Sequence, residues 1–336
     1  MNTKGFVEDA VSERYACLYN DMETVFYNIK QLGGYGMRII RFREQDQPPV
    51  LAVLAENSEV FPLSVNSLME LVSLARSSDR TPTEWVQREV EKEVPSRYLE
   101  ELDLLVPVEA PEVWAAGVTY ERSREARNHE AATSQTDIQT FYDKVYDADR
   151  PEIFFKSTLA RTIGPGDPIH LRSDSGWQVP EPELGLVLDR RGNIIGYTIG
   201  NDMSCRDIEG ENPLYLPQAK IWRNSCSIGP AVLLADAVAD PYDFRITCRI
   251  YRNGSEVVSG SASIGQLKRT LDELVDCLAQ DNVLFDGTVL LTGTCIVPPD
   301  EFTLMEGDRI EIEIPGIGIL ENPVHQPIKR REASIR

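Results

Sequence analysis

Residues 180–207 read PEPELGLVLDRRGNIIGYTIGNDMSCRD, and this stretch decides the fold. Two apolar runs, 184–188 and 194–199, lie on either side of the RRGN segment at 190–193, which has the composition of a turn. The pattern predicts a β-hairpin. With the turn centred between the second and third residues of RRGN, the pairs of one continuous apolar face are Leu184 with Ile199, Leu186 with Tyr197 and Leu188 with Ile195.

The opposite face of this hairpin gathers acidic residues. Glu181 would lie opposite Asp202, and Glu183 shares their face because side chains alternate along a strand. Opposed Cβ atoms lie about 4.5 to 5.5 Å apart. At about 5 Å and an effective dielectric near 20, each pair of like charges costs roughly 3 kcal/mol. The arrangement therefore needs a cation or a proton.

A hard divalent cation meets this need. Mg²⁺ takes six oxygen ligands and usually keeps several waters, which leaves positions for a bidentate ligand such as a 2-oxo acid. The glycines that share this face would leave space beside the ion. The alternative is that Glu181 and Glu183 are exposed strand residues and that Asp202 caps a turn. Pro182 has no N–H to donate and suits the rim of a sheet.

The 336 residues divide into two regions of different character. The first combines strand patterns at 36–42, 50–56 and 59–63 with amphipathic helical patterns, VNSLMELVSLAR and TEWVQREVEKEV. A threonine, a proline and a glutamate at the start of the second helix, TPTE, form a capping-box signal. Because the VPVEAP segment contains two prolines, we expect a small N-terminal α/β domain over residues 1–107.

Strands dominate the second region, 108–336, and the fold class is α+β. Asn253-Gly254 between two β patterns predicts a hairpin. One helix is expected at 265–280, with its apolar face made by Leu267, Leu271, Leu274, Val275 and Leu278. The alternating RIEIEIPGIGIL segment predicts a half-buried strand. The tail from Glu321, with Lys329, Arg330 and Arg331, is expected to be a surface extension.

The chain is strongly acidic. It has 54 Asp and Glu against 34 Lys and Arg, a net charge of -20. This balance argues against nucleic acid as a partner, because that affinity depends on Lys and Arg displacing counterions. No window approaches 18 consecutive apolar residues, and the first residues lack the order of a signal peptide. We therefore expect a cytoplasmic protein that is neither exported nor membrane-bound.

The cysteines and histidines do not suggest a nitrogen or sulfur metal site. The six cysteines are scattered without a C-x-x-C pair, and reduced thiols are the default in a cytoplasm. Only three histidines occur, His129, His170 and His325. If a metal is bound, oxygen is expected to bind it.

Eight blocks in the second region resemble the fumarylacetoacetate hydrolase superfamily in the family's order. The blocks are FFKS (154–157), the E-x-E pair, GYTIGNDMSCRD (196–207), Lys220, SIGPAVLL (227–234), YRNGSEVVSG (251–260), LLTGT (290–294) and EGDRIEIEIPGIGIL (306–320). The resemblance covers roughly residues 110–325. It implies a mixed β roll or barrel-like fold, a catalytic Mg²⁺ with Mn²⁺ or Ca²⁺ as substitutes, and a homodimer or homotetramer. The family's metal carboxylates fall on Glu181, Glu183 and Asp202.

The chain departs from the hydrolase members of this superfamily at one motif. Hydrolases carry a lid whose His and Glu activate water, but Ser123 and Ala126 stand at the corresponding positions here. His129 lies six residues after Ser123. The plainer interpretation is that it is a surface histidine, and the alternative is that it is a displaced base. The segments GWQVPEPELGLVLD, GNDMSCRDIEGENPLYLPQAKIW and WAAGVTYERSREAR are more similar to the 2-keto-3-deoxy-pentonate dehydratase branch.

That branch implies a dehydration. The carboxylate and ketone of the 2-oxo sugar acid would chelate Mg²⁺, a base would remove a C3 proton, and the C4 hydroxyl would leave. A substrate such as 2-keto-3-deoxy-D-arabinonate would give 2,5-dioxopentanoate, as in pentose catabolism. The first alternative is C–C hydrolysis of an acylpyruvate or a 2,4-diketo sugar acid. The second is a non-catalytic, metal-stabilised scaffold. No phosphate loop or dinucleotide fingerprint implies ATP or NAD.

The resemblance also implies roles for individual residues. Glu152 would be the acid/base carboxylate, although it could equally be a surface residue at a strand start. Lys156 follows an apolar run and would be costly to bury unpaired, which favours a place beside the metal carboxylates or the substrate. Lys220 would bind an enolate or a carboxylate. The Thr292-Gly293-Thr294 segment, and Thr294 above all, would bind the substrate carboxylate.

Two further pairs are expected near the site. Ser123 and Arg124 would contact the sugar hydroxyls. Arg206 and Asp207 would help to orient Asp202.

Overall fold

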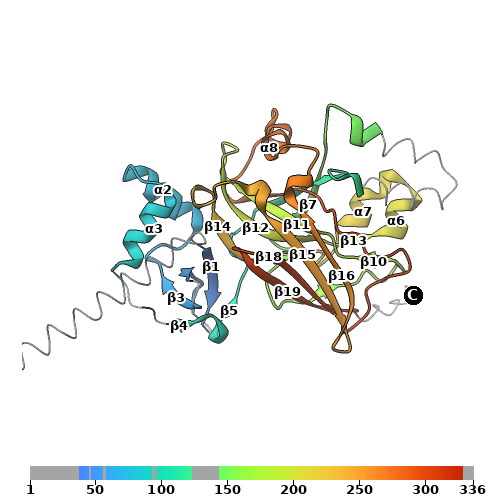
Figure 1. Cartoon of the computed structure of the whole chain (residues 1–336), viewed down its shortest axis with the longest axis horizontal. Helices are drawn as coiled ribbons and strands as arrows, with labels where there is room; N and C mark the ends of the chain where they lie inside the picture. The colour runs from blue at the N-terminus through green and yellow to red at the C-terminus, as the bar shows by residue number, and fades with distance from the viewer. Residues whose placement is uncertain are drawn as a thin grey trace, which may run out of the picture.

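The computed structural model describes residues 38–44, 47–55, 58–92, 95, 97–122 and 144–327. The described part is mostly sheet with few helices, so the α+β class is confirmed (Figure 1). A 12-stranded sheet and a five-stranded sheet make up most of the molecule. Both are mixed, because β17–β6, β14–β8 and β19–β9 pair in parallel while their other pairs are antiparallel. Neither sheet closes into a barrel within the described ranges.

The large sheet runs through ten strands in spatial order. They are β4 (Arg97–Tyr98), β3 (Glu59–Pro62), β2 (Val50–Leu54), β1 (Arg38–Arg43), β14 (Cys226–Leu234), β12 (Ile194–Asp202), β11 (Pro182–Leu188), β17 (Thr288–Leu291), β6 (Glu112–Gly117) and β7 (Glu152–Thr158). Off this path, β5 (Asp103–Leu104) pairs with β1 and β8 (Thr162–Ile163) with β14. A separate two-stranded sheet joins β10 (Gln178–Val179) and β13 (Ser204–Cys205).

The second sheet covers one face of the first. Its order is β16 (Ser255–Ser263), β15 (Arg245–Arg252), β18 (Arg309–Ile314), β19 (Gly318–His325) and β9 (Ile169–His170). One apolar cluster joins Leu186 and Ile199 of the large sheet with Ile250 and Ile312 of the second sheet. The apolar face expected for the hairpin therefore lies between the two sheets, as in a β roll.

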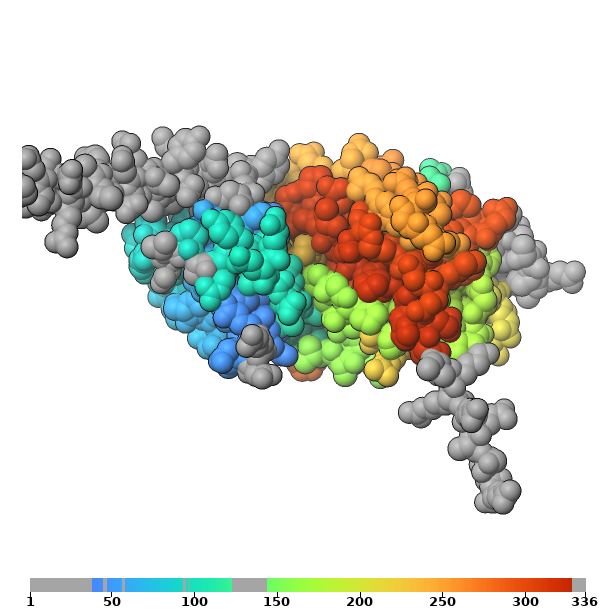
Figure 2. Space-filling view, turned by 90° about the horizontal axis from the view of Figure 1, so that it is seen from below, coloured from blue at the N-terminus to red at the C-terminus, as the bar shows by residue number. Residues whose placement is uncertain are grey.

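The N-terminal elements match their sequence patterns. The expected strands are β1, β2 and β3, and the helices are α2 (Leu68–Ser77) and α3 (Pro82–Val90). Thr81 caps α3 through a capping box with Glu84, with Pro82 in the first turn. These elements lie directly against the rest of the molecule (Figure 2). The domain boundary at residue 107 stays a prediction. The pairing of β1 with β14 joins the two regions on either side of it.

The β11–β12 hairpin has the expected register over most of its length. Leu184 pairs with Ile199 and Leu186 with Tyr197, but Leu188 pairs with Ile194. The expected Leu188–Ile195 pair was therefore wrong, and Ile195 packs in a second cluster on the other side of the sheet.

The turn explains this shift. The Asp189 N–H donates to the Asn193 carbonyl, and the Asp189 carbonyl accepts from the Gly192 N–H. Gly192 has φ +80°. A left-handed glycine after a type I turn adds one residue to the strand as a bulge. The Asp189 carboxylate closes the loop by accepting from the N–H groups of Arg191 and Asn193.

Three predictions for the second region concern a hairpin turn, a helix and the tail, and not all of them are confirmed. Asn253 and Gly254 both have positive φ and form the predicted hairpin turn. The helix expected at 265–280 is α8 (Leu271–Ala279), which begins later than expected because the capping box of Thr270 and Glu273 fixes its start. Residues 321–325 are not a surface extension but the end of β19, paired with β18 and β9. Lys329, Arg330 and Arg331 lie outside the described residues.

The remaining helices lie apart from α2 and α3. Figure 1 shows α6 (Arg206–Glu211) and α7 (Leu216–Lys220) at the opposite end of the molecule. Short 3₁₀ turns occur at Leu99–Glu101, Pro213–Tyr215, Ala235–Ala237, Pro241–Asp243 and Ile264–Gln266. No helix in the described ranges is both long and apolar enough to cross a bilayer.

Candidate metal centre and active site

Three carboxylates meet at the start of β11 and the end of β12. The Asp202 N–H donates to the Glu181 carbonyl at 2.9 Å, which continues the predicted register to this pair. One carboxylate oxygen from each of Glu181, Glu183 and Asp202 lies within 4.8 Å of the other two. The three residues are only 3%, 1% and 1% exposed, so the alternative of exposed strand residues was wrong.

The glycines beside the trio do not leave an open space. A Cβ on Gly200 would lie 2.3 Å from Cδ2 of Leu291, and one on Gly185 would lie 2.9 Å from Cγ2 of Thr198. The expectation of space beside the ion was therefore wrong. Side chains from β17 and β12 fill that volume, so the glycines serve close packing of the strands.

Three buried cationic side chains contact the trio. Lys220 Nζ lies 2.5 Å from Glu181 Oε2 and 2.9 Å from Asp202 Oδ2. Lys156 Nζ lies 2.6 Å from Asp202 Oδ1, which confirms its expected place beside the carboxylates. Arg206 Nη2 lies 2.8 Å from Glu181 Oε1. The charges of the trio are therefore compensated from several elements.

The role expected for Arg206 and Asp207, orienting Asp202, stays a prediction. Arg206 pairs with Glu181, whose backbone carbonyl accepts from the Asp202 N–H. Asp207 accepts hydrogen bonds from Ser175 Oγ at 2.6 Å and from the Gly176 N–H at 2.7 Å. Arg206 and Asp207 are the first two residues of α6, where adjacent side chains point in different directions.

Glu183 is the member of the trio that accepts from the 292–294 segment. Its Oε2 accepts a 2.6 Å hydrogen bond from the Gly293 N–H. Burial, with the charges of Asp202 and Glu181, raises the pKa of Glu183 well above its usual range, although Lys220 opposes that rise. A bound divalent cation would relieve this repulsion, and three carboxylates are the oxygen donors that Mg²⁺ prefers. The residues present therefore fit the ion.

The 292–294 segment is engaged within the protein. Gly293 has φ +93°, and a Cβ there would lie 2.0 Å from Thr119 Oγ1, so only glycine fits. Its N–H serves Glu183, and the Thr294 hydroxyl accepts from the Ile296 N–H at 3.2 Å. Thr294 is buried, and its contact with a substrate carboxylate stays a prediction.

Glu152 lies at the start of β7, paired with Gly117 of β6. Its Oε2 lies 2.0 Å from the point where a Cβ on Gly117 would be, so the missing side chain makes room for the carboxylate. Phe154 follows on the same face of the strand, whereas Lys156 lies at a register shift between β6 and β7. Lys156 contacts Asp202, and the Phe154 ring lies 5.5 Å from Lys220 Nζ. Glu152 therefore faces the side of β7 that borders the trio.

Thr119 and Tyr120 are part of this neighbourhood and were missed from the sequence. The Thr119 hydroxyl donates to the Thr292 carbonyl at 2.8 Å. Tyr120 is 2% exposed, and burial raises its pKa, with Cys295 and Glu183 adding to the rise. Both follow Val118, a β-branched residue at φ +53°, a rare conformation that marks a constrained turn. Their sequence signal was that both lie in the stretch that corresponds to the lid motif of the hydrolases.

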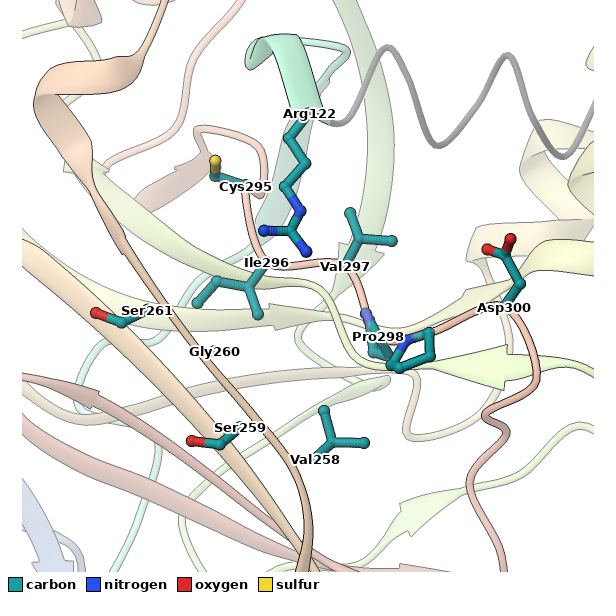
Figure 3. Close-up of a pocket in the computed structure, with 11 residues that line it drawn as sticks. Arg122, Val258, Ser259, Gly260, Ser261, Cys295, Ile296, Val297, Pro298 and Asp300 are labelled. Carbon is teal, nitrogen blue, oxygen red and sulfur yellow. The ribbon is translucent and has the colours of Figure 1, made fainter.

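A cavity of about 450 Å³ lies beyond Thr294. Arg122 extends over Ile296 and Val297 there, and residues 258–261 of β16 form another wall (Figure 3). None of the three carboxylates lines this cavity. Ser123 and Arg124, the expected sugar contacts, and His129 lie outside the described residues.

Comparison with known proteins gives consistent results. Residues 113–325 match the family model described as "Fumarylacetoacetate (FAA) hydrolase C-terminal". The chain is 46% identical over 258 residues to "Probable 2-keto-3-deoxyxylonate dehydratase" of Haloferax volcanii, covering 76% of this chain and 86% of that protein. It is 40% identical over 279 residues to "2-dehydro-3-deoxy-D-arabinonate dehydratase" of Saccharolobus solfataricus, covering 83% and 92%.

A solved structure agrees with this similarity. It is described as "2-keto-3-deoxy-D-arabinonate dehydratase complexed with magnesium and 2,5-dioxopentanoate". The TM-score is 0.73 at 36% identity, over 87% of this chain and 100% of that chain. With the family model matching well over half of its residues, the chain belongs to the fumarylacetoacetate hydrolase family.

Proposed function

We propose that the protein is a Mg²⁺-dependent hydro-lyase that dehydrates a 2-keto-3-deoxy-pentonate, such as 2-keto-3-deoxy-D-arabinonate, to 2,5-dioxopentanoate. The observation that carries the proposal is the buried trio, whose oxygens lie within 4.8 Å of one another. It occurs in a chain that is 40% identical, over 83% of its length, to a protein named for that dehydration.

Glu181, Glu183 and Asp202 would hold Mg²⁺. Mn²⁺ or Ca²⁺ are substitutes, because both also accept carboxylate and carbonyl oxygens. When bound, the ion supplies Lewis-acid chemistry: it polarises the 2-oxo group and stabilises the negative charge that develops when C3 loses a proton.

Glu152 is the base in this proposal. A carboxylate on the trio's side of β7 can take a proton from C3 and return it to the departing C4 hydroxyl, which leaves as water. Elimination leaves a C3=C4 double bond next to the ketone. Transfer of a proton from C5 to C3 turns this into an enol at C4=C5, which gains a proton at C4 and loses the hydroxyl proton to give the C5 aldehyde, so the atoms balance without a redox cofactor. Thr294, with Ser123 and Arg124, would orient the substrate.

Lys156 and Lys220 hold the carboxylates in this account. Both ammonium groups are buried and paired with the trio. Lys220 also contacts Ser204 Oγ at 2.6 Å, and Lys156 donates to the Met203 carbonyl at 2.9 Å. Their positive charge favours an anionic substrate, and neither is needed as a nucleophile.

The direct test incubates the full chain with 2-keto-3-deoxy-D-arabinonate and Mg²⁺ and couples product formation to a semialdehyde dehydrogenase. We expect 2,5-dioxopentanoate to form with Mg²⁺ and not after treatment with EDTA. Persistence of the substrate would refute the proposal. Pyruvate in place of the semialdehyde would instead support the alternative of C–C cleavage.

The cellular setting is also a proposal. A cytoplasmic homodimer or homotetramer is consistent with the family resemblance. Light scattering of the purified chain measures the assembly, and a monomeric mass would contradict it.

A further inference from the structure

Three cationic side chains lie against the trio before any metal is present. The Glu181 oxygens contact Arg206 at 2.8 Å and Lys220 at 2.5 Å. The Asp202 oxygens contact Lys156 at 2.6 Å and Lys220 at 2.9 Å. Two of the three carboxylates are therefore paired with cations, while Glu183 accepts from the Gly293 N–H.

All six of these side chains are buried. The three cationic residues are at most 2% exposed and the three acidic residues at most 3%. In a buried cluster, solvent screens charge poorly, so an uncompensated charge is unfavourable. A divalent cation on the trio would add two positive charges to a site that already holds three cations. The lysines and the arginine therefore oppose the ion that the carboxylates attract.

We infer that the set of Lys156, Lys220 and Arg206 makes the binding of the metal and of an anionic 2-oxo acid mutually dependent. The inference rests on the proposed function for the class of substrate. A 2-oxo acid brings a carboxylate charge together with a ketone oxygen, so it offsets part of the positive charge that the metal adds. Because coupling between two ligands is reciprocal, each must raise the affinity of the other by the same factor.

This coupling also determines specificity. A neutral sugar, aldehyde or lactone brings no charge and gains nothing from the cationic set. An acid with a neighbouring ketone brings both charge and a second oxygen. The set therefore selects anionic chelators, a task distinct from holding the metal.

Lys220 is the most informative member of the set. Its ammonium contacts two of the three carboxylates, and it also contacts Ser204 Oγ at 2.6 Å. Lys220→Met removes the charge and keeps most of the length of the side chain. The loss leaves the trio with less positive compensation, so Mg²⁺ should bind more tightly to the variant than to the wild type.

The test titrates Mg²⁺ into the full-length protein by calorimetry, with and without pyruvate, a 2-oxo acid that has no C4 hydroxyl to lose. For the wild type we expect pyruvate to raise Mg²⁺ affinity by roughly 5- to 150-fold, the usual range of coupling between sites. For Lys220→Met we expect about tenfold tighter Mg²⁺ binding without pyruvate, because a neighbouring positive charge is gone. The coupling factor should fall.

Two results would overturn the inference. One is a wild-type Mg²⁺ affinity that pyruvate does not change. The other is a Lys220→Met protein that binds Mg²⁺ no more tightly than the wild type. Lys92→Met is the matched control, because Lys92 is exposed and pairs only with Glu89 in the contacts described; it should bind like the wild type. If Lys220→Met does not fold, Lys156→Met tests the same change in Mg²⁺ affinity, because Lys156 contacts one carboxylate of the trio, Asp202.

This experiment separates the inference from the proposed function. Coupling with pyruvate involves no turnover, so it can hold even where the semialdehyde assay fails. If turnover is confirmed and the coupling is missing, the function stands and the cationic set has only a positioning role.

Discussion

The Glu183 side chain shows most directly what the trio needs. It is buried with its Oε2 on the Gly293 N–H, and the charges of Asp202 and Glu181 raise its pKa. A neutral amide can keep the hydrogen bond but cannot supply the charge that a cation needs. The charge of Glu183 therefore lowers the stability of the metal-free fold, whereas binding of the metal requires that charge.

We expect Glu183→Gln to abolish Mg²⁺-dependent activity, by at least about 10²-fold, while the fold survives. The variant loses a repulsive charge, so its Tm without Mg²⁺ should equal or exceed that of the wild type. Calorimetry and thermal unfolding provide both measurements. Glu313→Gln, on β18 and paired with Arg249, is the control and should behave like the wild type. Full activity in Glu183→Gln would remove this residue from the site.

At the scale of elements, the β6–β7 pair positions Glu152. The carboxylate lies where a side chain on Gly117 would be, and Val118 follows at φ +53°. The position of the Glu152 side chain on β7 thus depends on the absence of a side chain at Gly117 of β6. A side chain at residue 117 would meet the flexible end of Glu152 and not backbone.

We therefore expect Gly117→Ala to displace the Glu152 carboxylate at little cost to stability. Turnover should fall by roughly 10²-fold, approaching the loss in Glu152→Gln, because general acid–base catalysis contributes about 10²- to 10⁴-fold. Mg²⁺ affinity should be unchanged in both variants. Gly176→Ala is the control, since its nearest atom would be 3.9 Å away. Weaker Mg²⁺ binding in Glu152→Gln would show that Glu152 acts as a ligand instead.

A buried histidine of β9 lies beside a histidine of β19. His170 lies opposite His325 with ring centroids 5.5 Å apart, and it is 9% exposed. Burial lowers the pKa of His170, and Arg223 and His325 lower it further. The unfolded chain therefore binds the proton more readily than the folded chain does.

The sign of the pH effect follows from this difference. The contribution of His170 is fully present above the ordinary histidine pKa of about 6.5, and it is lost as the pH falls below that value. We expect the Tm of the wild type to decrease from pH 7.5 to pH 5 more steeply than that of His170→Gln or His170→Phe. Parallel Tm profiles for the wild type and both variants would contradict the assignment.

At the scale of the whole molecule, the acidic surplus is separate from the site. The trio has three carboxylates, and three cationic side chains contact two of them, Glu181 and Asp202. The net charge of -20 therefore arises elsewhere. The site is also tied to the N-terminal elements, because β1 pairs with β14, and β14 pairs with the strand that carries Asp202.

These ion pairs predict how the protein responds when the metal is removed. Because the trio is compensated by Lys156, Lys220 and Arg206, we expect the EDTA-treated protein to stay folded. Mg²⁺ at ten times its dissociation constant should raise the Tm by roughly 2 °C through mass action. Circular dichroism and thermal unfolding test both statements. Unfolding on chelation would show that the metal, and not the cationic set, holds the trio together.

The sequence by itself determined the local features of this protein. The turn composition and the apolar alternation of residues 180–207 predicted the hairpin register, and with it the meeting of Glu181, Glu183 and Asp202. The capping box at Thr81 and the Asn253-Gly254 turn were also predicted from the sequence. Each depends on neighbours a few residues apart, where backbone geometry and side-chain alternation leave few alternatives.

Only the tertiary structure decided most of what surrounds that trio. Lys156 of β7 was expected beside the carboxylates, but the contacts that Lys220 of α7 makes with Glu181 and Asp202 were not. Leu291 of β17 fills the space that the glycines were expected to leave. Arg206 was expected, with Asp207, to orient Asp202, and its ion pair with Glu181 was not anticipated. Such contacts are set by how distant elements pack, because a pattern along one strand specifies its own faces but not which side chains of another element will reach them.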